Sequence, residues 1–414
     1  MNSEIKIDIR LEQYFFDFLK KQCNAEDDLR KEVNEFYEMS FSSSRNIKTK
    51  ILKNDILCFL DKPLEYISDN IIVTSSLKNC LNDLIDGQFV IADKLAFEFL
   101  QSVYSICLKP NKVEFIDDFH DGQDLKNIID KITNALPNRI VAIGGGRTMD
   151  YAKFISLQTN IELLAIPSSL ATHVYASPKI HALDPIKDLG YNKTIDGDPA
   201  HLSLVDIKLL DLLLSENKRL IYSGFGDIMA FINARHDWID SAYNGNERYS
   251  IFVDNSIELI INYLKDIDVN KPLKNWISDY VFIQCLLCHI TDWVGSAPAS
   301  GAEHLFAKSV EDNAETSPIH GEVVALGVLI FSYIRNKDIQ LVEVLMDKFD
   351  ISRSLNKLGL NKELVILALS KSADEGHKKN RHTILFNINT SYEYFSDVIS
   401  KMLLYIKKAM KLIL

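Results

Sequence analysis

Short apolar runs alternate with helical stretches from Phe89 to Asp206. The runs are FVIAD near residue 89, KVEFID near 112, RIVAIGGG near 139, ELLAIPSS near 162 and LSLVD near 202. Strands that alternate with helices form a parallel sheet with helices on both faces. After Asp206 the strand-like runs largely stop and amphipathic helical patterns continue to the end. The sequence therefore predicts an α/β fold, in which a domain with a parallel sheet is followed by an all-helical domain.

These patterns divide the 414 residues into three parts. We expect a helical N-terminal extension over residues 1–75, an α/β domain over 76–210 and a helical domain over 211–414. The chain has no internal repeat and no long linker, so we expect the two larger domains to pack closely around a cleft.

The 57 acidic residues outnumber the 46 basic ones, and the formal net charge is −11. This charge gives no reason to approach nucleic acid or an anionic membrane, so an anionic substrate must be attracted by a local positive site. No apolar run approaches the roughly 20 residues that cross a bilayer, and the beginning does not resemble a signal peptide. We therefore expect a cytoplasmic protein without membrane insertion.

The six cysteines are scattered along the chain, which is typical of reduced thiols. One group, CLLCH from Cys285 to His289, matches the attachment motif of a c-type haem. It lies within DYVFIQCLLCHITDW, an apolar stretch of helical character, and haem attachment would need an export signal. We therefore interpret this segment as a packed helix.

A glycine-rich turn joins an apolar strand to a helix in RIVAIGGGRTMDYAKFIS. Gly144, Gly145 and Gly146 let the backbone approach a pyrophosphate, and the helix start offers free N–H groups and a positive dipole end. The turn is neither the G-x-G-x-x-G fingerprint nor a P-loop, and such turns also occur for steric reasons alone. Phosphate binding, which would make this a Rossmann-like nucleotide-binding domain, and a purely steric role both remain open here.

A second strand runs into a polar loop in AIPSSLATHVYASP, residues 165 to 178. In a parallel sheet this loop lies beside the glycine turn, at the carboxyl ends of the strands. Ser168, Ser169 and Ser177 could therefore bind a cofactor or substrate, or they could simply cap a turn.

Three segments of the helical part contain candidate metal ligands. Asp227 lies in GFGDIMAFINARHDW, His304 in PASGAEHLFAKSVED and His320 in SPIHGEVVALGV. Two imidazoles and one carboxylate with a vacant position are typical of a catalytic divalent metal that polarises a substrate oxygen. A single buried histidine is more often a core residue, but two histidines, each with glycine and glutamate nearby, favour a metal site.

The five motifs GGGRTMDYAK, IPSSLATHVYASP, GFGDIMAFINARHDW, PASGAEHLFAK and IHGEVVALG occur in order within residues 85–335. Together they resemble the sn-glycerol-1-phosphate dehydrogenase family, within the dehydroquinate synthase-like and iron-containing alcohol dehydrogenase-like superfamily. The resemblance implies that Asp227, His304 and His320 hold zinc, or else nickel or iron. It also implies NAD or NADP as cofactor, bound by the residues Gly144, Gly145, Gly146, Arg147, Thr148, Asp150, Ser168, Ser169 and Ser177.

The resemblance further implies hydride transfer between nicotinamide and a small phosphorylated ketone such as dihydroxyacetone phosphate, or a small polyol. Two residues depart from the family pattern, because His173 replaces an aspartate and Lys308 a histidine, both expected to contact substrate. The first change removes a negative charge and the second adds a positive one, so we expect a more anionic substrate, with Lys308 binding it. His173 or a metal-bound water would relay the proton. Alternatively, Lys308 extends to solvent, His173 only packs, and ordinary triose phosphate reduction remains.

Two other interpretations remain. A sugar-phosphate cyclase of the dehydroquinate synthase type would use Lys308, although the cyclase motif around its metal histidine is absent. A catalytically silent family member would not be expected to retain three buried ligands. The preference for NAD or NADP is open, with Asp93 and Asp117 as candidate ribose contacts, and so is assembly as a homo-oligomer.

Overall fold

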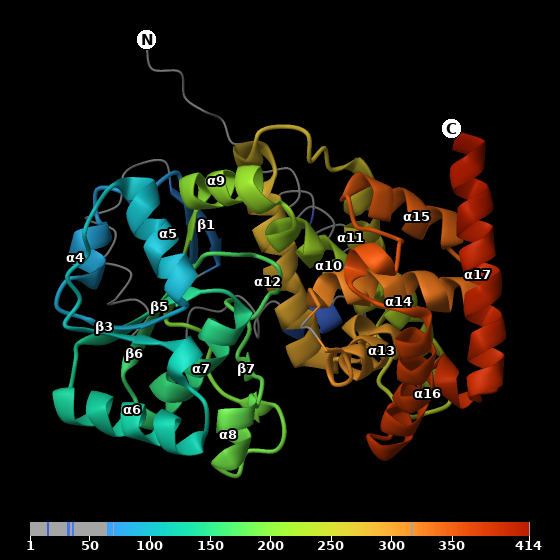
Figure 1. Ribbon diagram of the computed structural model, residues 1–414, viewed down its shortest axis with the longest axis horizontal. Coiled ribbons are helices and arrows are strands. Elements are labelled where there is room, and N and C mark those ends of the chain that lie inside the picture. The colour runs from blue at the N-terminus through green and yellow to red at the C-terminus, as the bar shows by residue number, and fades with distance from the viewer. Residues whose placement is uncertain are drawn as a thin grey trace. The chain divides into compact units, whose positions relative to one another are not determined.

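The computed structural model describes residues 15, 31–33, 35–36, 64–68, 70–315 and 318–413 (Figure 1). Its described residues fall into two compact units. The first contains those of Tyr37–Leu220 and Asn270–Cys288, and the second those of Phe15–Phe36, Ile221–Val269 and His289–Leu414.

The first unit is built on a seven-stranded sheet with the order β1-β2-β9-β6-β5-β3-β4. Strand β1 pairs with β2 in the antiparallel direction, and the other six strands are parallel. The strand bounds are β1 Leu64–Ser68, β2 Ile71–Thr74, β3 Phe89–Ala92, β4 Lys112–Phe115, β5 Arg139–Gly144, β6 Glu162–Pro167 and β9 Leu202–Asp206. A separate pair joins β7 (Lys179–Ile180) to β8 (Ile195–Asp196). The predicted parallel sheet is confirmed.

Helices cover both faces of this sheet, as predicted (Figure 1). Because alternate side chains of a strand point to opposite faces, Val90 and Ala92 contribute to one core together with α4, α5 and α9. Helices α6 and α7 pack against each other on the other face. The helix bounds are α4 Leu81–Ile85, α5 Lys94–Tyr104, α6 Gly122–Ala135, α7 Gly146–Thr159, α8 Asp184–Asp188 and α9 Ile207–Asn217.

One assignment from the sequence needs correction. Residues 64–68 and 71–74 were expected to belong to the helical extension, whereas the structure places them in the sheet as β1 and β2. The run Ile71–Thr74 is buried at every position and pairs with β9, so its β-branched side chains pack as a central strand. Most of the predicted extension lies outside the described residues. Phe15 and Phe36 are helical and fully buried, and both rings pack against Phe252.

The second unit is helical, as predicted, and its elements run from yellow-green to red in Figure 1. Helix α13 packs against α14 and α16, and α14 also packs against α15 and α17. Their bounds are α10 Arg219–Tyr243, α11 Ile251–Asp266, α13 Ala302–Glu311, α14 His320–Arg335, α15 Ile339–Lys348, α16 Lys362–Lys378 and α17 Tyr392–Ile413.

The segment with the CLLCH motif forms helix α12 (Ile277–Val294). Cys285 and Cys288 are 4% and 3% exposed, so both thiols lie in the core. The packed-helix interpretation is confirmed. Within the part of the chain that the structure describes, no helix has the length and apolar character to cross a membrane.

Asp206 fastens the carboxyl end of β9 to its surroundings. Its carboxylate is fully buried and accepts hydrogen bonds from the Tyr104 hydroxyl, the Leu77 N–H at 3.0 Å and the Leu209 N–H at 3.1 Å. Burial raises the pKa of Asp206, and these donors oppose the rise.

We expect Asp206→Ala to lower the free energy of unfolding by about 2–4 kcal/mol, because three buried donors lose their acceptor. Asp93→Ala is the matched control, since Asp93 caps α5 through one hydrogen bond to Ala96 and its loss should cost about 1 kcal/mol. Urea unfolding followed by circular dichroism measures both. Equal losses for the two variants would contradict the role given to Asp206.

Candidate metal centre and glycine turn

Two glycines let helices α10 and α14 touch at the point where two candidate ligands lie. A Cβ atom added to Gly321 would overlap the carbonyl oxygen of Ser223, and one added to Gly226 would overlap that of Gly321. Gly226 precedes Asp227 in α10, and Gly321 follows His320 in α14. The glycine contact therefore brings these two side chains together from positions far apart in the sequence.

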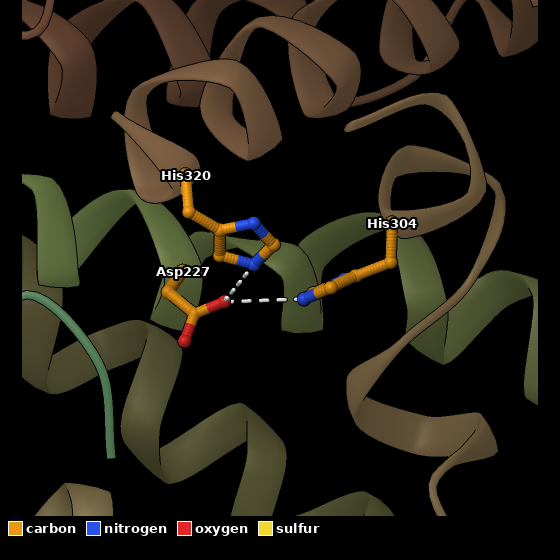
Figure 2. Close-up of side chains that lie close together, drawn as sticks. All are labelled: Asp227, His304 and His320. Atoms are coloured by element: carbon orange, nitrogen blue, oxygen red, sulfur yellow. Dashed lines mark hydrogen bonds and ion pairs between the residues drawn. The ribbon is translucent and has the colours of Figure 1, made fainter. Parts of the chain in front are cut away.

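The third candidate ligand comes from the first turn of α13. The Nε2 atom of His304 lies 3.1 Å from Oδ1 of Asp227, and Nε2 of His320 lies 3.7 Å from the same oxygen. Figure 2 shows the two imidazoles and the carboxylate pointing toward one another. One ligand atom from each residue lies within 4.8 Å of the others. The structure thus brings together Asp227, His304 and His320, as the sequence predicted.

Two glutamates fix the orientation of the imidazoles. The Nδ1 atom of His304 donates to Glu303 at 3.0 Å, and that of His320 donates to Glu311 at 2.6 Å. A carboxylate can only accept, so in both rings Nδ1 carries the proton. Each Nε2 therefore faces the shared space as a potential ligand atom, as in the carboxylate-histidine-metal arrangement of zinc sites.

The charges at the centre favour a bound cation. Burial lowers the pKa of His304, but the hydrogen bonds to Asp227 and Glu303 outweigh it and raise the pKa to about 9. Burial likewise raises the pKa of Glu303, and its hydrogen bonds, that from His304 foremost, hold it below the ordinary value. Without a metal the centre therefore binds a proton where a divalent ion would sit.

The donor set fits a divalent metal of the zinc type. Two neutral imidazole nitrogens and one carboxylate are the ligands that catalytic zinc uses when it keeps a position for substrate or water. Asp227 is 7% exposed, whereas the side chains of His304 and His320 are 19% and 36% exposed, so the centre can be reached from outside.

In the first unit, the glycine turn lies at the carboxyl edge of the sheet. Gly144 pairs with Pro167 across β5 and β6, and the Ser168 N–H donates to the Gly144 carbonyl at 3.0 Å. The glycine turn and the serine loop are therefore neighbours, as the sequence predicted for a parallel sheet.

Gly144 and Gly145 have different surroundings in the turn. A Cβ atom on Gly144 would overlap the Thr148 side chain, whereas one on Gly145 would meet no atom within 4 Å. Gly145 precedes α7, and no side chain of the described residues caps this helix start. The open side at Gly145 thus leaves backbone room and free N–H groups for a phosphate. Arg147 lies exposed on the same first turn.

Asp150 is tied into the protein. Its carboxylate is 4% exposed and accepts from the His181 N–H at 3.1 Å. One helical turn later, the buried Lys153 ammonium donates to the carbonyls of Val174, Ser177 and Lys179 at 3.1, 3.0 and 2.6 Å. Helix α7 therefore holds the last part of the serine loop and the residue that follows it.

The serines have separate environments. Ser169 Oγ donates to the Leu220 carbonyl at 3.0 Å, and Ser177 Oγ accepts from the Lys179 N–H at 3.1 Å. Ser168 is half-buried at the sheet edge. Contact of these three residues with a cofactor remains a prediction.

The two residues that depart from the family pattern lie in different units. His173 is half-buried, and its carbonyl accepts from the Ala176 N–H at 2.9 Å. The Lys308 side chain is 52% exposed, and its ammonium lies 3.1 Å from a carboxylate oxygen of Asp312. Their roles toward a substrate remain predictions, as do those of Asp93 and the exposed Asp117 toward a ribose.

Several residues at these sites were not identified from the sequence. Glu303 was noted only as a neighbour of His304, although adjacency could have suggested its role. Glu311 lies nine residues before His320, and no local pattern connects the two. Lys153 follows the glycine turn in an ordinary helical stretch, and only the fold shows that its ammonium is buried.

The sequence is similar to those of known proteins. The family model described as iron-containing alcohol dehydrogenase matches residues 79–195. A glycerol-1-phosphate dehydrogenase [NAD(P)+] from Metallosphaera sedula is 27% identical over 66% of this chain and 77% of its own. Another from Archaeoglobus fulgidus is 26% identical over 81% of this chain and 95% of its own.

The fold is also similar to solved structures. The 2-epi-5-epi-valiolone synthase from Streptomyces hygroscopicus, solved with NAD+ and Zn2+ bound, aligns with a TM-score of 0.52 at 15% identity. The alignment covers 83% of this chain and 98% of that one. At this identity the similarity shows the fold alone.

These relatives define the class: the chain is an NAD(P)-dependent dehydrogenase, and its residues 79–195 match the iron-containing alcohol dehydrogenase model. Its curated relatives within that class share one activity. The chain is similar over most of its length to glycerol-1-phosphate dehydrogenases.

Replacing Gly321 by alanine should separate α10 from α14, because the new methyl group overlaps backbone of the opposite helix. We expect the variant to lose most of its bound metal and to unfold at lower temperature. Gly145→Ala adds the same methyl group in open space and should retain both properties. Metal content and melting temperature measure the effect, and equal metal content in the two variants would contradict it.

The raised pKa of His304 predicts how pH acts on the metal-free protein. Because the folded pKa, about 9, exceeds the ordinary value of 6.5, proton binding stabilises the folded state below about pH 6.5. This contribution disappears as the pH rises through about 9, while metal affinity increases over the same range. Melting curves with a chelator should show the difference between wild type and His304→Gln shrinking with pH. A constant difference would argue against this protonation.

Proposed function

We propose that this chain reduces a small phosphorylated ketone with NADH or NADPH at a divalent metal held by Asp227, His304 and His320. The convergence of these three side chains, with both Nδ1 atoms fixed by glutamates, carries the proposal. Dihydroxyacetone phosphate, or a related more anionic ketone, is the substrate class that the family suggests.

The metal, when bound, supplies a Lewis acid that polarises the substrate oxygen. Asp227 contributes the negative charge that holds the cation, and the two histidines contribute neutral nitrogens. Glu303 and Glu311 keep the Nδ1 protons in place, which leaves each Nε2 available. Zinc suits this donor set best, and nickel and iron also accept imidazole and carboxylate.

The cofactor role is proposed for the glycine turn and its neighbours. The open position at Gly145 and the uncapped start of α7 support pyrophosphate binding. Thr148 Oγ1 is buried beneath Gly144 and has no hydrogen-bond partner among the described residues. Its contact is therefore with the turn itself, and we assign it to shaping the loop that receives the cofactor.

The substrate shell is proposed to bind an anion. Lys308 lies one helical turn after His304, and its ammonium reaches Asp312 on the exposed side of α13. A phosphorylated substrate would compete with Asp312 for this ammonium. His173 is proposed to relay the proton that accompanies hydride transfer, because an imidazole can both accept and donate a proton.

The cyclase alternative shares this fold, since the synthase described above is a fold neighbour. The two activities differ in net redox change. A dehydrogenase consumes reduced nicotinamide in proportion to substrate, whereas a cyclase returns it within each turnover. Absorbance of reduced nicotinamide during turnover of phosphorylated ketones separates the two.

We expect Asp227→Ala and His304→Ala to lose bound metal and to lower kcat/KM for ketone reduction by about 1000-fold or more. His236→Ala is the matched control, because His236 lies on the same helix and its Nε2 pairs with Asp338 at 3.0 Å, apart from the centre. Its activity should equal that of wild type. The assay follows oxidation of NADH with dihydroxyacetone phosphate, with zinc, nickel and iron supplied separately. Wild-type protein with no bound metal and no activity on any phosphorylated ketone would refute the proposal.

A further inference from the structure

A buried hydrogen-bonded chain leads away from the metal centre through the helical unit. It begins at Glu303, which is fully buried and accepts from His304 through Oε1. The other oxygen, Oε2, accepts from the side-chain amide of Asn233 at 2.6 Å. Asn233 is 1% exposed, so this contact is shielded from solvent.

Asn233 connects Glu303 to a guanidinium. Its Oδ1 accepts from Nε of Arg335 at 3.2 Å. A carboxylate only accepts and a guanidinium only donates, so a single orientation of the amide satisfies both partners. The orientation of the Asn233 amide is therefore fixed, because its NH2 group must face Glu303 and its oxygen must face Arg335.

These hydrogen bonds lead back to α13, the helix that carries Glu303. Arg335 pairs with Asp237, and Asp237 accepts from the Ala302 N–H at 2.9 Å and the Ile384 N–H at 2.7 Å. Ala302 begins α13 and directly precedes Glu303. The side chain of Arg335 is 10% exposed and that of Asp237 is 2% exposed.

The three helices that supply the candidate metal ligands, α10, α13 and α14, also supply the residues of this hydrogen-bonded chain. Helix α10 supplies Asp227 to the centre and Asn233 and Asp237 to the chain behind it. Helix α14 supplies His320 from its first residue and Arg335 from its last. Helix α13 supplies Glu303 and His304, and a methyl group on Gly301, just before it, would lie 2.5 Å from an Asp237 oxygen.

Stability alone does not account for this arrangement. Buried ion pairs cost desolvation, and well-packed apolar residues of similar volume are often as stabilising. Here the Arg335 guanidinium pairs with Asp237 and with Asp240, and Glu303 reaches it only through the Asn233 amide. The Glu303 carboxylate is thus held in place with one oxygen facing His304. A negative Glu303 makes the imidazole a stronger ligand for a cation.

We propose that Asn233, Arg335 and Asp237 are positioning residues that fix Glu303, and through it the direction of His304, so that they set the affinity of the centre for its metal. This inference rests on the proposed function, because it assumes that a cation binds at His304. None of the three residues is assigned to touch metal, cofactor or substrate.

The test measures Co2+ binding by the full-length, metal-free protein. Asn233→Leu removes both links at similar volume and should weaken Co2+ affinity about 10- to 100-fold and alter the visible absorption of the bound ion. Arg335→Lys keeps the charge, but one ammonium cannot replace the fork that joins Asn233 to Asp237, so we expect an intermediate loss.

Arg353→Lys is the matched control. The Arg353 side chain is 11% exposed and pairs with Glu343 at 3.0 Å in the same unit, without a link to the candidate ligands. It should lower the melting temperature while leaving Co2+ affinity and absorption unchanged. Asn233→Leu with the affinity of Arg353→Lys would overturn the inference, and if that variant fails to fold, Arg335→Lys decides by the same comparison.

Different results would overturn the proposed function and the role given to Asn233, Arg335 and Asp237. Wild-type protein that binds no Co2+, or that binds it equally well after His304→Ala, overturns the proposed function and the inference with it. Tight wild-type binding that depends on His304 but not on Asn233 or Arg335 overturns the inference alone.

Discussion

The close contact of α10 and α14 at Gly226 and Gly321 is the constraint on which the metal centre depends. Backbone meets backbone there, so neither helix can shift without a steric cost. The candidate ligands next to these glycines, Asp227 and His320, are held by main chain as well as by side-chain packing. His304 then needs only the placement of the first turn of α13 to complete the set.

Around this contact, the charged groups also favour a bound cation. Burial would favour a neutral His304, yet the carboxylates of Asp227 and Glu303 hold its pKa near 9. Together with Glu311 they give the centre a negative surplus, which a divalent ion neutralises better than one proton. The glycine turn of the first unit uses the opposite electrostatics, since Gly145 and the start of α7 offer N–H groups to a phosphate.

The sequence predicted those parts of the structure that have a local pattern. Strands β3, β4, β5, β6 and β9 read as short apolar runs, and all five lie in the parallel sheet. Strands β1 and β2 were missed because Ile71–Thr74 is a short apolar run at the end of a segment that we interpreted as helical. The three candidate ligands were identifiable because each lies in a motif. The links from Asn233 to Glu303 and to Arg335 span 70 and 102 residues, and nothing in the sequence pairs residues over such distances.

A cation shared by Asp227, His304 and His320 would join three helices, and the first and last of these ligands are 93 positions apart in the sequence. Such a cross-link restricts the unfolded chain much as a disulfide does, but it can be removed by a chelator or by scarcity of the metal. Metal supply would then govern how long the folded protein survives proteases in the cell, as well as how fast it turns over substrate.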